Sequence, residues 1–129
     1  MHVVKVLEYY KATGGTFRWD AMVDDTKFEL YIYKWRVPLP CPLRVSVVIS
    51  LPDDNRTDLY QFKNSKAVST AERSQLPVVT KVKFIEEHTK TQKYEPVGDR
   101  EIGSIYIPKT LLPEEPPLEL IISVEWLAG

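Results

Sequence analysis

The chain has 129 residues, of which 43% are hydrophobic and 27% charged, and its formal net charge is −1. These values are typical of one globular domain and argue against a disordered chain, which would be poorer in aromatic and β-branched residues. The near-neutral charge also disfavours non-specific binding of nucleic acid, which normally requires a basic surplus.

The scarcity of cysteine limits the chemistry further. The single cysteine, Cys41, cannot form an intramolecular disulfide or supply a cysteine-rich zinc site. The first residues do not have the pattern of a signal peptide, and no window approaches 18 consecutive apolar residues. We therefore expect a cytoplasmic protein that does not enter a membrane and that carries neither a metal nor another cofactor.

Hairpin signals dominate the first part of the chain. Gly14-Gly15 separates two segments rich in β-branched and aromatic residues, "HVVKVLEYYKAT" and "TFRWDAMV", which predicts a hairpin. Asp24-Asp25-Thr26 then reverses the chain into the stretch that begins at Phe28, since short polar side chains favour such turns.

The stretch "FELYIYKWRV", residues 28–37, predicts one strand with two apolar faces. The aliphatic face consists of Phe28, Leu30 and Ile32, and the opposite face of Tyr31, Tyr33 and Trp35. Lys34 and Arg36 continue the aliphatic side, so the cations are expected to point away from the rings. A strand of this kind must be covered on both sides, by its own chain or by another molecule.

Proline-rich segments and alternating strands fill the remainder. "PLPCP" (38–42) and "PEEPP" (113–117) predict stiff extended connections that carry the chain around a corner of the fold. Apolar residues alternate over 43–51, 78–84 and 118–126, which predicts half-buried strands. The Gly98-Asp99 pair predicts a third hairpin.

The helix signal is confined to one place. Ser69 and Glu72 form a capping box ahead of Pro77, which predicts one short helix near 69–76. No internal repeat and no domain-dividing linker is apparent, so residues 1–129 are expected to form a single all-β domain. We expect an antiparallel β-sandwich or a closed β-barrel of about 7–9 strands.

No constellation of catalytic or metal-binding residues is visible. His88 follows Glu86 at the end of a strand and is interpreted as part of a solvated surface pair. Cys41 lies between two prolines without a nearby base, and the acidic segment 53–58 lacks the glycine and the terminal glutamate of a calcium loop. We assign no catalytic residue and no metal ligand.

Binding is therefore the favoured function. Tyr31, Tyr33 and Trp35 are predicted to form an interaction face with Arg36 at its rim, because Tyr, Trp and Arg dominate binding hot spots. The expected partner is a protein, including a second copy of the chain. A barrel that binds single-stranded nucleic acid or carbohydrate is the alternative, and a hydrolase with an unrecognised pair of carboxylates is the second alternative.

Overall fold

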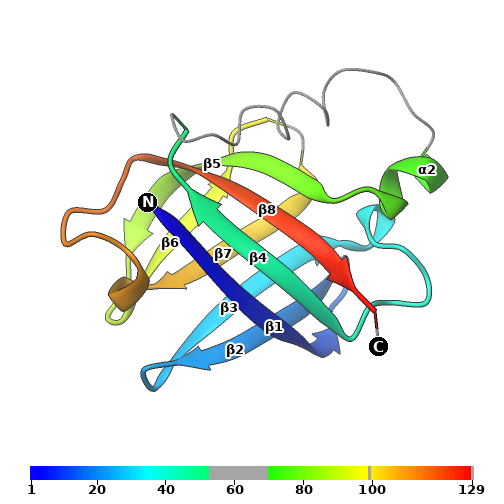
Figure 1. The fold of residues 1–129 in the computed structure, drawn as a ribbon, viewed down its shortest axis with the longest axis horizontal. Coiled ribbons are helices and arrows are strands. Elements are labelled where there is room, and N and C mark those ends of the chain that lie inside the picture. Colours follow the sequence, from blue (N-terminus) through cyan, green and yellow to red (C-terminus); the bar gives the residue numbers. More distant parts are fainter. Residues whose placement is uncertain (53–69, 99, 129) are drawn as a thin grey trace.

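A computed structural model of the chain describes residues 1–52, 70–98 and 100–128. Within these residues, antiparallel strands close into a barrel in the order β1-β2-β3-β7-β6-β5-β8-β4 (Figure 1). The ring is completed by pairing of β4 with β1. The predicted all-β fold of about seven to nine strands is confirmed, and the architecture is the barrel rather than the sandwich.

The strands are β1 (His2–Ala12), β2 (Thr16–Val23), β3 (Thr26–Tyr33), β4 (Arg44–Ser50), β5 (Val78–Glu87), β6 (Thr91–Pro96), β7 (Ile102–Pro108) and β8 (Glu119–Leu127). Two 3-10 turns, η1 (Lys34–Arg36) and η2 (Lys109–Leu111), follow β3 and β7. The predicted short helix is found as α2 (Thr70–Gln75), while Ser69 of the capping box lies outside the described residues. None of the described helices is long and apolar enough to span a membrane.

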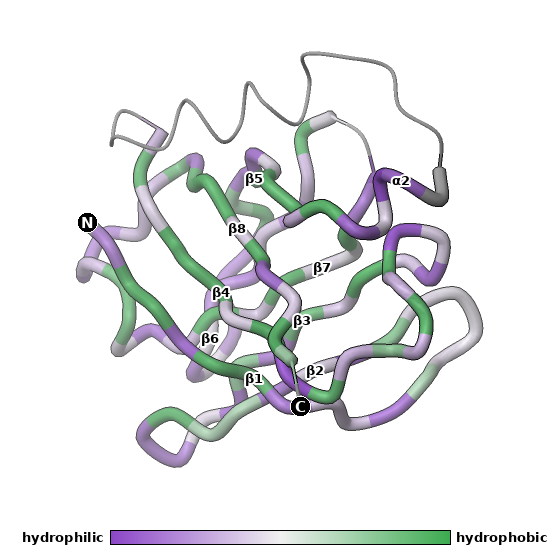
Figure 2. Tube along the Cα trace, turned by 45° about the vertical axis from the view of Figure 1, so that its right-hand side comes forward, coloured by the Kyte–Doolittle hydropathy of each residue, from purple (hydrophilic) through white to green (hydrophobic). Residues whose placement is uncertain are grey.

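The interior of the barrel follows from the period-two pattern of the strands. Every strand contributes at least one fully buried side chain to the interior, for example Val47 on β4, Ile105 on β7 and Ile122 on β8. An eight-stranded barrel is just wide enough for its side chains to fill the interior. Hydrophobic stretches accordingly run along the strands, and hydrophilic residues gather at hairpin tips such as the one between β2 and β3 (Figure 2).

The residues at the turn between β2 and β3 suit its left-handed backbone conformation. Asp24 and Asp25 both adopt positive φ angles, of 48° and 63°. Two consecutive residues in this region form the tight hairpin turn whose twist matches that of the flanking strands, and Asp tolerates it better than most residues. This hairpin confirms the prediction for Asp24-Asp25-Thr26.

The barrel contains an internal repeat, contrary to the expectation from the sequence. Residues 31–43 correspond to residues 106–118 at a constant offset of 75 positions. The identical pairs are Tyr31/Tyr106, Ile32/Ile107, Lys34/Lys109, Pro38/Pro113, Pro42/Pro117 and Leu43/Leu118. The order of elements is the same in both parts, three strands, a 3-10 turn, a proline segment and a fourth strand.

The same offset of 75 relates hydrogen bonds in the two halves. The Trp19 indole N–H donates to the Pro42 carbonyl at 3.0 Å, and the Tyr94 hydroxyl donates to the Pro117 carbonyl at 2.7 Å. Three backbone hydrogen bonds of the first half also recur in the second half. The bond from Thr13 to Thr16 corresponds to that from His88 to Thr91, and the bond from Tyr9 to Leu43 corresponds to that from Phe84 to Leu118. The bond from Lys34 to Gly15 corresponds to that from Lys109 to Lys90. β1 and β5 also carry β-bulges at matching positions.

The two equivalent halves, 3–50 and 78–125, therefore build one barrel together. They meet where β3 pairs with β7 and where β4 pairs with β8 (Figure 1). In each half the proline segment crosses one end of the barrel, from the third strand past the second and first to the fourth. An interior aromatic side chain holds each segment by its carbonyl, which confirms that the proline segments turn a corner of the barrel.

Candidate binding surfaces

The structure separates the four residues of the predicted interaction face. β3 ends at Tyr33, and residues 34–36 form the turn η1, so Trp35 does not continue the row of tyrosines. The Tyr33 N–H donates to the Glu101 carbonyl at 3.1 Å, and the Lys34 N–H donates to the Gly15 carbonyl at 3.1 Å. These bonds bend the chain away from the sheet at the point where the sequence predicted a longer strand.

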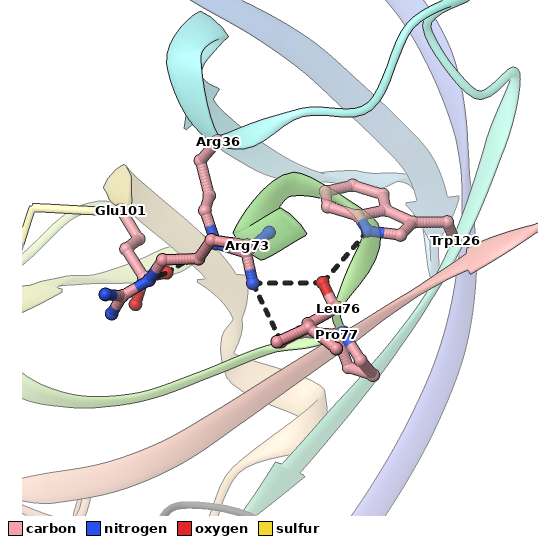
Figure 3. Close-up of polar contacts among 6 residues, drawn as sticks. All are labelled: Arg36, Arg73, Leu76, Pro77, Glu101 and Trp126. Carbon is pink, nitrogen blue, oxygen red and sulfur yellow. Dashed lines mark hydrogen bonds and ion pairs between the residues drawn. The ribbon is translucent and has the colours of Figure 1, made fainter. Parts of the chain in front are cut away.

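The prediction that Arg36 lies at the rim of an exposed face is wrong, because its side chain is fully buried. Its Nε donates to the carboxylate of Glu101, and its Nη2 donates to the carbonyls of Leu76 at 2.9 Å and Pro77 at 2.8 Å (Figure 3). Burial lowers the pKa of Arg36, and the bond to Glu101 opposes this shift. Arg36 therefore holds α2 and the start of β5 against the barrel.

Two further side chains complete this buried cluster. Arg73 of α2 donates to the same Glu101 oxygen at 3.2 Å, and the Trp126 indole donates to the Leu76 carbonyl at 3.1 Å (Figure 3). Trp126 also packs against Trp19 with 6.2 Å between ring centroids. The cluster closes the end of the barrel at which α2 lies.

Tyr31 belongs to a row of side chains on the outer side of the barrel, which we call the tyrosine row. It crosses five adjacent strands and consists of Tyr10 (β1), Arg18 (β2), Tyr31 (β3), Tyr106 (β7) and Lys93 (β6). The Arg18 guanidinium lies 4.5 Å from the Tyr10 centroid and 5.7 Å from that of Tyr31. Tyr31 meets Tyr106 edge to face at 6.3 Å, and Lys93 lies 5.8 Å from the Tyr106 centroid.

The cations of the row, Arg18 and Lys93, come from neighbouring strands, while Lys34 and Arg36 point away from the tyrosines, towards Phe17 and Glu101. Both cations of the row are paired with carboxylates. Arg18 pairs with Asp20 at 3.0 Å and Glu29 at 2.6 Å, and Lys93 pairs with Glu95 at 3.6 Å. Burial raises the pKa of Tyr31, and the nearby Glu29 carboxylate adds to this effect. Arg18 and Lys93 thus already have carboxylate partners, while Lys11 and Lys27 lie over the Tyr10 ring, 5.7 and 5.0 Å from its centroid.

A shallow groove of about 280 Å³ lies between the two central tyrosines of the row. It is lined by Thr16, Tyr31, Gly103, Ser104 and Tyr106. β7 bulges here, because two of its residues, Gly103 and Ser104, oppose Tyr31 alone on β3. Since glycine has no side chain, the floor of the groove is backbone, and bulges of this kind are common beside binding sites.

A second surface lies at the end of the barrel where α2 packs. We call it the loop surface and define it by Leu39, Pro40, Cys41, Pro42, Leu43 and Leu127. Leu39 and Leu43 are 78% and 61% exposed, and residues 40–43 with Leu127 line a hollow of about 490 Å³. Trp35, on η1 at the same end of the barrel, is 46% exposed. Exposed apolar surface of this kind marks interaction sites in soluble proteins.

The described residues offer little for covalent or metal chemistry. They contain no group of three or more His, Cys, Asp or Glu side chains placed to hold a metal ion. Burial raises the pKa of the Cys41 thiol, which makes it a poorer nucleophile at neutral pH. His88 lies 3.6 Å from Glu86, and both side chains are largely exposed, as interpreted from the sequence.

Sequence reasoning missed Arg18, Tyr106, Gly103 and Leu39 as candidate binding residues. Tyr106 comes from a strand far from Tyr31 in the sequence, so only the strand order brings the two together, whereas Arg18 lies opposite Tyr31 in the predicted β2–β3 hairpin. A signal was nonetheless present in the sequence, because Tyr106 stands 75 positions after Tyr31 in the repeated segment.

Comparison of the chain with protein-family models and with curated protein sequences found no match.

Proposed function

We propose that this chain is a non-enzymatic protein-binding domain that associates with a second copy of itself through the loop surface. The observation that carries the proposal is the exposure of Leu39, at 78%, beside an apolar hollow on the same rigid segment. Burying exposed leucine side chains is favourable by roughly 1.5–3 kcal/mol each.

The repeat indicates that the fold does not require this apolar surface. At the equivalent positions of the second half, Glu114 and Glu115 stand in place of Leu39 and Pro40. The second proline segment keeps the same path with two charges, so an exposed leucine is not needed to form the connection. Trp35 likewise corresponds to a threonine, Thr110.

A second copy suits the surface because it offers both a protrusion and a hollow of the same chemical character. In a two-fold dimer, each surface contacts its own equivalent, so Leu39 of one copy would enter the hollow of the other and the reverse. The prolines on either side fix the backbone, which reduces the entropy lost on association. The acidic segment 113–117 cannot make the same contact, so association would end at the dimer.

Sedimentation velocity over a range of concentrations tests the proposal. The wild type should show a concentration-dependent dimer, and Leu39→Glu, which copies the residue of the second half, should be monomeric. Leu118→Glu is the matched control, since Leu118 is 76% exposed at the position equivalent to Leu43. A wild type that stays monomeric at high concentration, or a Leu39→Glu variant that still dimerises, would contradict the proposal.

Labelling of Cys41 by a thiol reagent provides an independent measurement. Cys41 lines the hollow and is the only cysteine of the chain. Its labelling rate should fall as the wild-type concentration rises and should not depend on concentration in Leu39→Glu. A rate independent of concentration in both proteins would place the contact elsewhere.

Binding of single-stranded nucleic acid, the alternative function, has weaker support than self-association. The tyrosine row provides stacking rings, but its Arg18 and Lys93 are already paired with carboxylates. Binding a phosphate beside Tyr31 or Tyr106 would require breaking those pairs or accepting the repulsion of Glu29 and Glu95. A hydrolase would require a convergent pair of acids, and neither the groove nor the hollow described above has a carboxylate among its lining residues.

A further inference from the structure

The groove of the tyrosine row has the chemical composition of a site for a polyhydroxylated ligand. Four of its five lining residues, Thr16, Tyr31, Ser104 and Tyr106, carry a hydroxyl group, and the fifth is Gly103. Hydroxyls both donate and accept hydrogen bonds, and tyrosine rings offer flat apolar faces beside them. The volume of about 280 Å³ is near the lower end of the range of small-molecule sites, roughly 300 Å³ and above.

The electrostatics of the groove favour a ligand without charge. Ser104 Oγ lies 3.5 Å from Glu95, which itself pairs with Lys93 at 3.6 Å. On the other side, Arg18 is neutralised by Asp20 and Glu29. An anionic ligand would meet carboxylates on both flanks without finding an unpaired cation among the row residues, whereas a neutral hydroxyl could donate to them.

Comparison of the two halves indicates that the groove is not a requirement of the fold. At the positions equivalent to Gly103 and Ser104, the first half has Phe28 and Glu29. Phe28 is buried in the core, and Glu29 lies over its own sheet and binds Arg18 at 2.6 Å. The second half has instead a bulge, a glycine and a short hydroxyl side chain, which together open the groove.

We propose that the groove lined by Tyr31 and Tyr106 binds one neutral sugar ring, which packs against one of the two tyrosine rings over the Gly103 backbone and exchanges hydrogen bonds with Ser104 and Glu95. This site lies on the side of the barrel and the loop surface lies at its end. The proposal therefore does not depend on dimerisation through the loop surface, and either proposal can fail without the other.

Gly103→Val is the most informative variant, because it fills the groove from its floor. A Cβ at Gly103 would lie 3.4 Å from the Tyr31 Cβ, which is ordinary van der Waals contact, and the glycine does not have the left-handed φ that excludes other residues. A β-branched residue is also favoured in strands. The variant should therefore fold, and thermal unfolding provides the check.

The experiment is a titration of the ¹⁵N-labelled protein with neutral monosaccharides, namely glucose, galactose, mannose and N-acetylglucosamine, followed by amide chemical shifts. We expect at least one sugar to bind with a dissociation constant of order 1 mM. Shifts should centre on β3 and β7. Gly103→Val should weaken binding at least tenfold, as should Tyr106→Ala, which removes one wall of the groove.

Ser46→Val is the matched control, since it adds the same side chain at a partly exposed position on β4, the strand opposite β7 in the barrel. It should bind sugar like the wild type. The proposal is overturned if no sugar shifts the β3 and β7 amides at tens of millimolar, or if the shifts persist in Gly103→Val. It is also overturned if a single-stranded oligonucleotide or an anionic polysaccharide binds this groove and neutral sugars do not.

Discussion

Replacing Glu101 by glutamine should destabilise the barrel more than any other single polar change in the buried cluster. Glu101 is fully buried and accepts hydrogen bonds from Arg36 and Arg73. Removing its charge leaves the buried Arg36 guanidinium with neutral acceptors only, the amide oxygen and the backbone carbonyls, and under the uncompensated repulsion of Arg73. Breaking a buried ion pair from one side costs about 3–5 kcal/mol, a large share of the roughly 5–15 kcal/mol that stabilise a domain.

Replacing Arg36 should reduce the free energy of unfolding by less than replacing Glu101, because Glu101 has two arginine partners. In Arg36→Met, the carboxylate keeps its bond to Arg73 at 3.2 Å, and the Leu76 carbonyl keeps the Trp126 indole as a donor. The Pro77 carbonyl loses its side-chain donor. We expect a loss of about 2–3 kcal/mol, set mainly by desolvated groups left without donors.

The double variant Arg36→Met/Glu101→Leu separates charge from packing. Replacing both partners by apolar residues of similar size is often neutral or stabilising, so the double variant should be at least about 1–2 kcal/mol more stable than Glu101→Gln. Urea unfolding followed by tryptophan fluorescence and by circular dichroism gives each free energy of unfolding. Trp126 reports on this end of the barrel, because its indole binds Leu76.

Two outcomes would refute the reasoning. A Glu101→Gln variant that loses less than about 1 kcal/mol would mean that the guanidinium reaches water or rearranges without cost. A double variant as unstable as Glu101→Gln would mean that packing around Arg36, and not its charge, holds the end of the barrel. Leu111→Met, at the position equivalent to Arg36 in the other half, controls for the effect of a methionine in a 3-10 turn.

Two further predictions concern the bonds that hold the proline segments. Burial raises the pKa of Tyr94 to about 12, so the unfolded chain loses this proton near pH 10 while the folded chain retains it. The stabilisation is therefore complete below pH 10 and is lost towards pH 12, by roughly 2–3 kcal/mol, and urea titrations should find a steeper loss of stability over this range in the wild type than in Tyr94→Phe. Trp19→Phe removes the bond to Pro42 and should cost about 1 kcal/mol while accelerating thiol labelling of Cys41, and an unchanged labelling rate would show that Trp19 does not hold the segment.

The strands were predictable because their signal is local. Alternation of apolar residues identifies an inward face within any stretch of five or more residues, as over Val45, Val47 and Ile49, and the turn residues mark where each strand ends. The closure of the barrel was not predictable in this way, since pairing of β4 with β1 and of β3 with β7 depends on residues far apart in the sequence.

The candidate site was predicted only in part for the same reason. Tyr31 does face outward among aromatic and cationic side chains, but its neighbours Arg18 and Tyr106 are supplied by other strands. Arg36 was misplaced because the end of β3 is set by backbone bonds from Tyr33 and Lys34 to distant carbonyls. Once the chain leaves the sheet at η1, the alternation of faces no longer applies, and Arg36 turns inward to Glu101.

The repeat gives this protein an internal standard against which functional residues can be separated from structural ones. Where the halves agree, as in Trp19 and Tyr94 bound to Pro42 and Pro117, the barrel itself accounts for the residues. Where the halves differ at exposed positions, the fold tolerates either residue, so the residue that is present requires an explanation other than folding.

Two of these differences lie at the proposed sites, at separate places on the described surface. Leu39 against Glu114 makes one proline segment apolar, and Ser104 against Glu29 opens a groove on one side of the tyrosine pair. Placing the residue of one half into the other tests both differences. Glu114→Leu should create a second association surface, and Ser104→Glu should close the groove with a larger side chain whose charge is repelled by Glu95, 3.5 Å from the Ser104 hydroxyl. If neither exchange alters self-association or sugar binding, divergence between the halves does not report on function in this barrel.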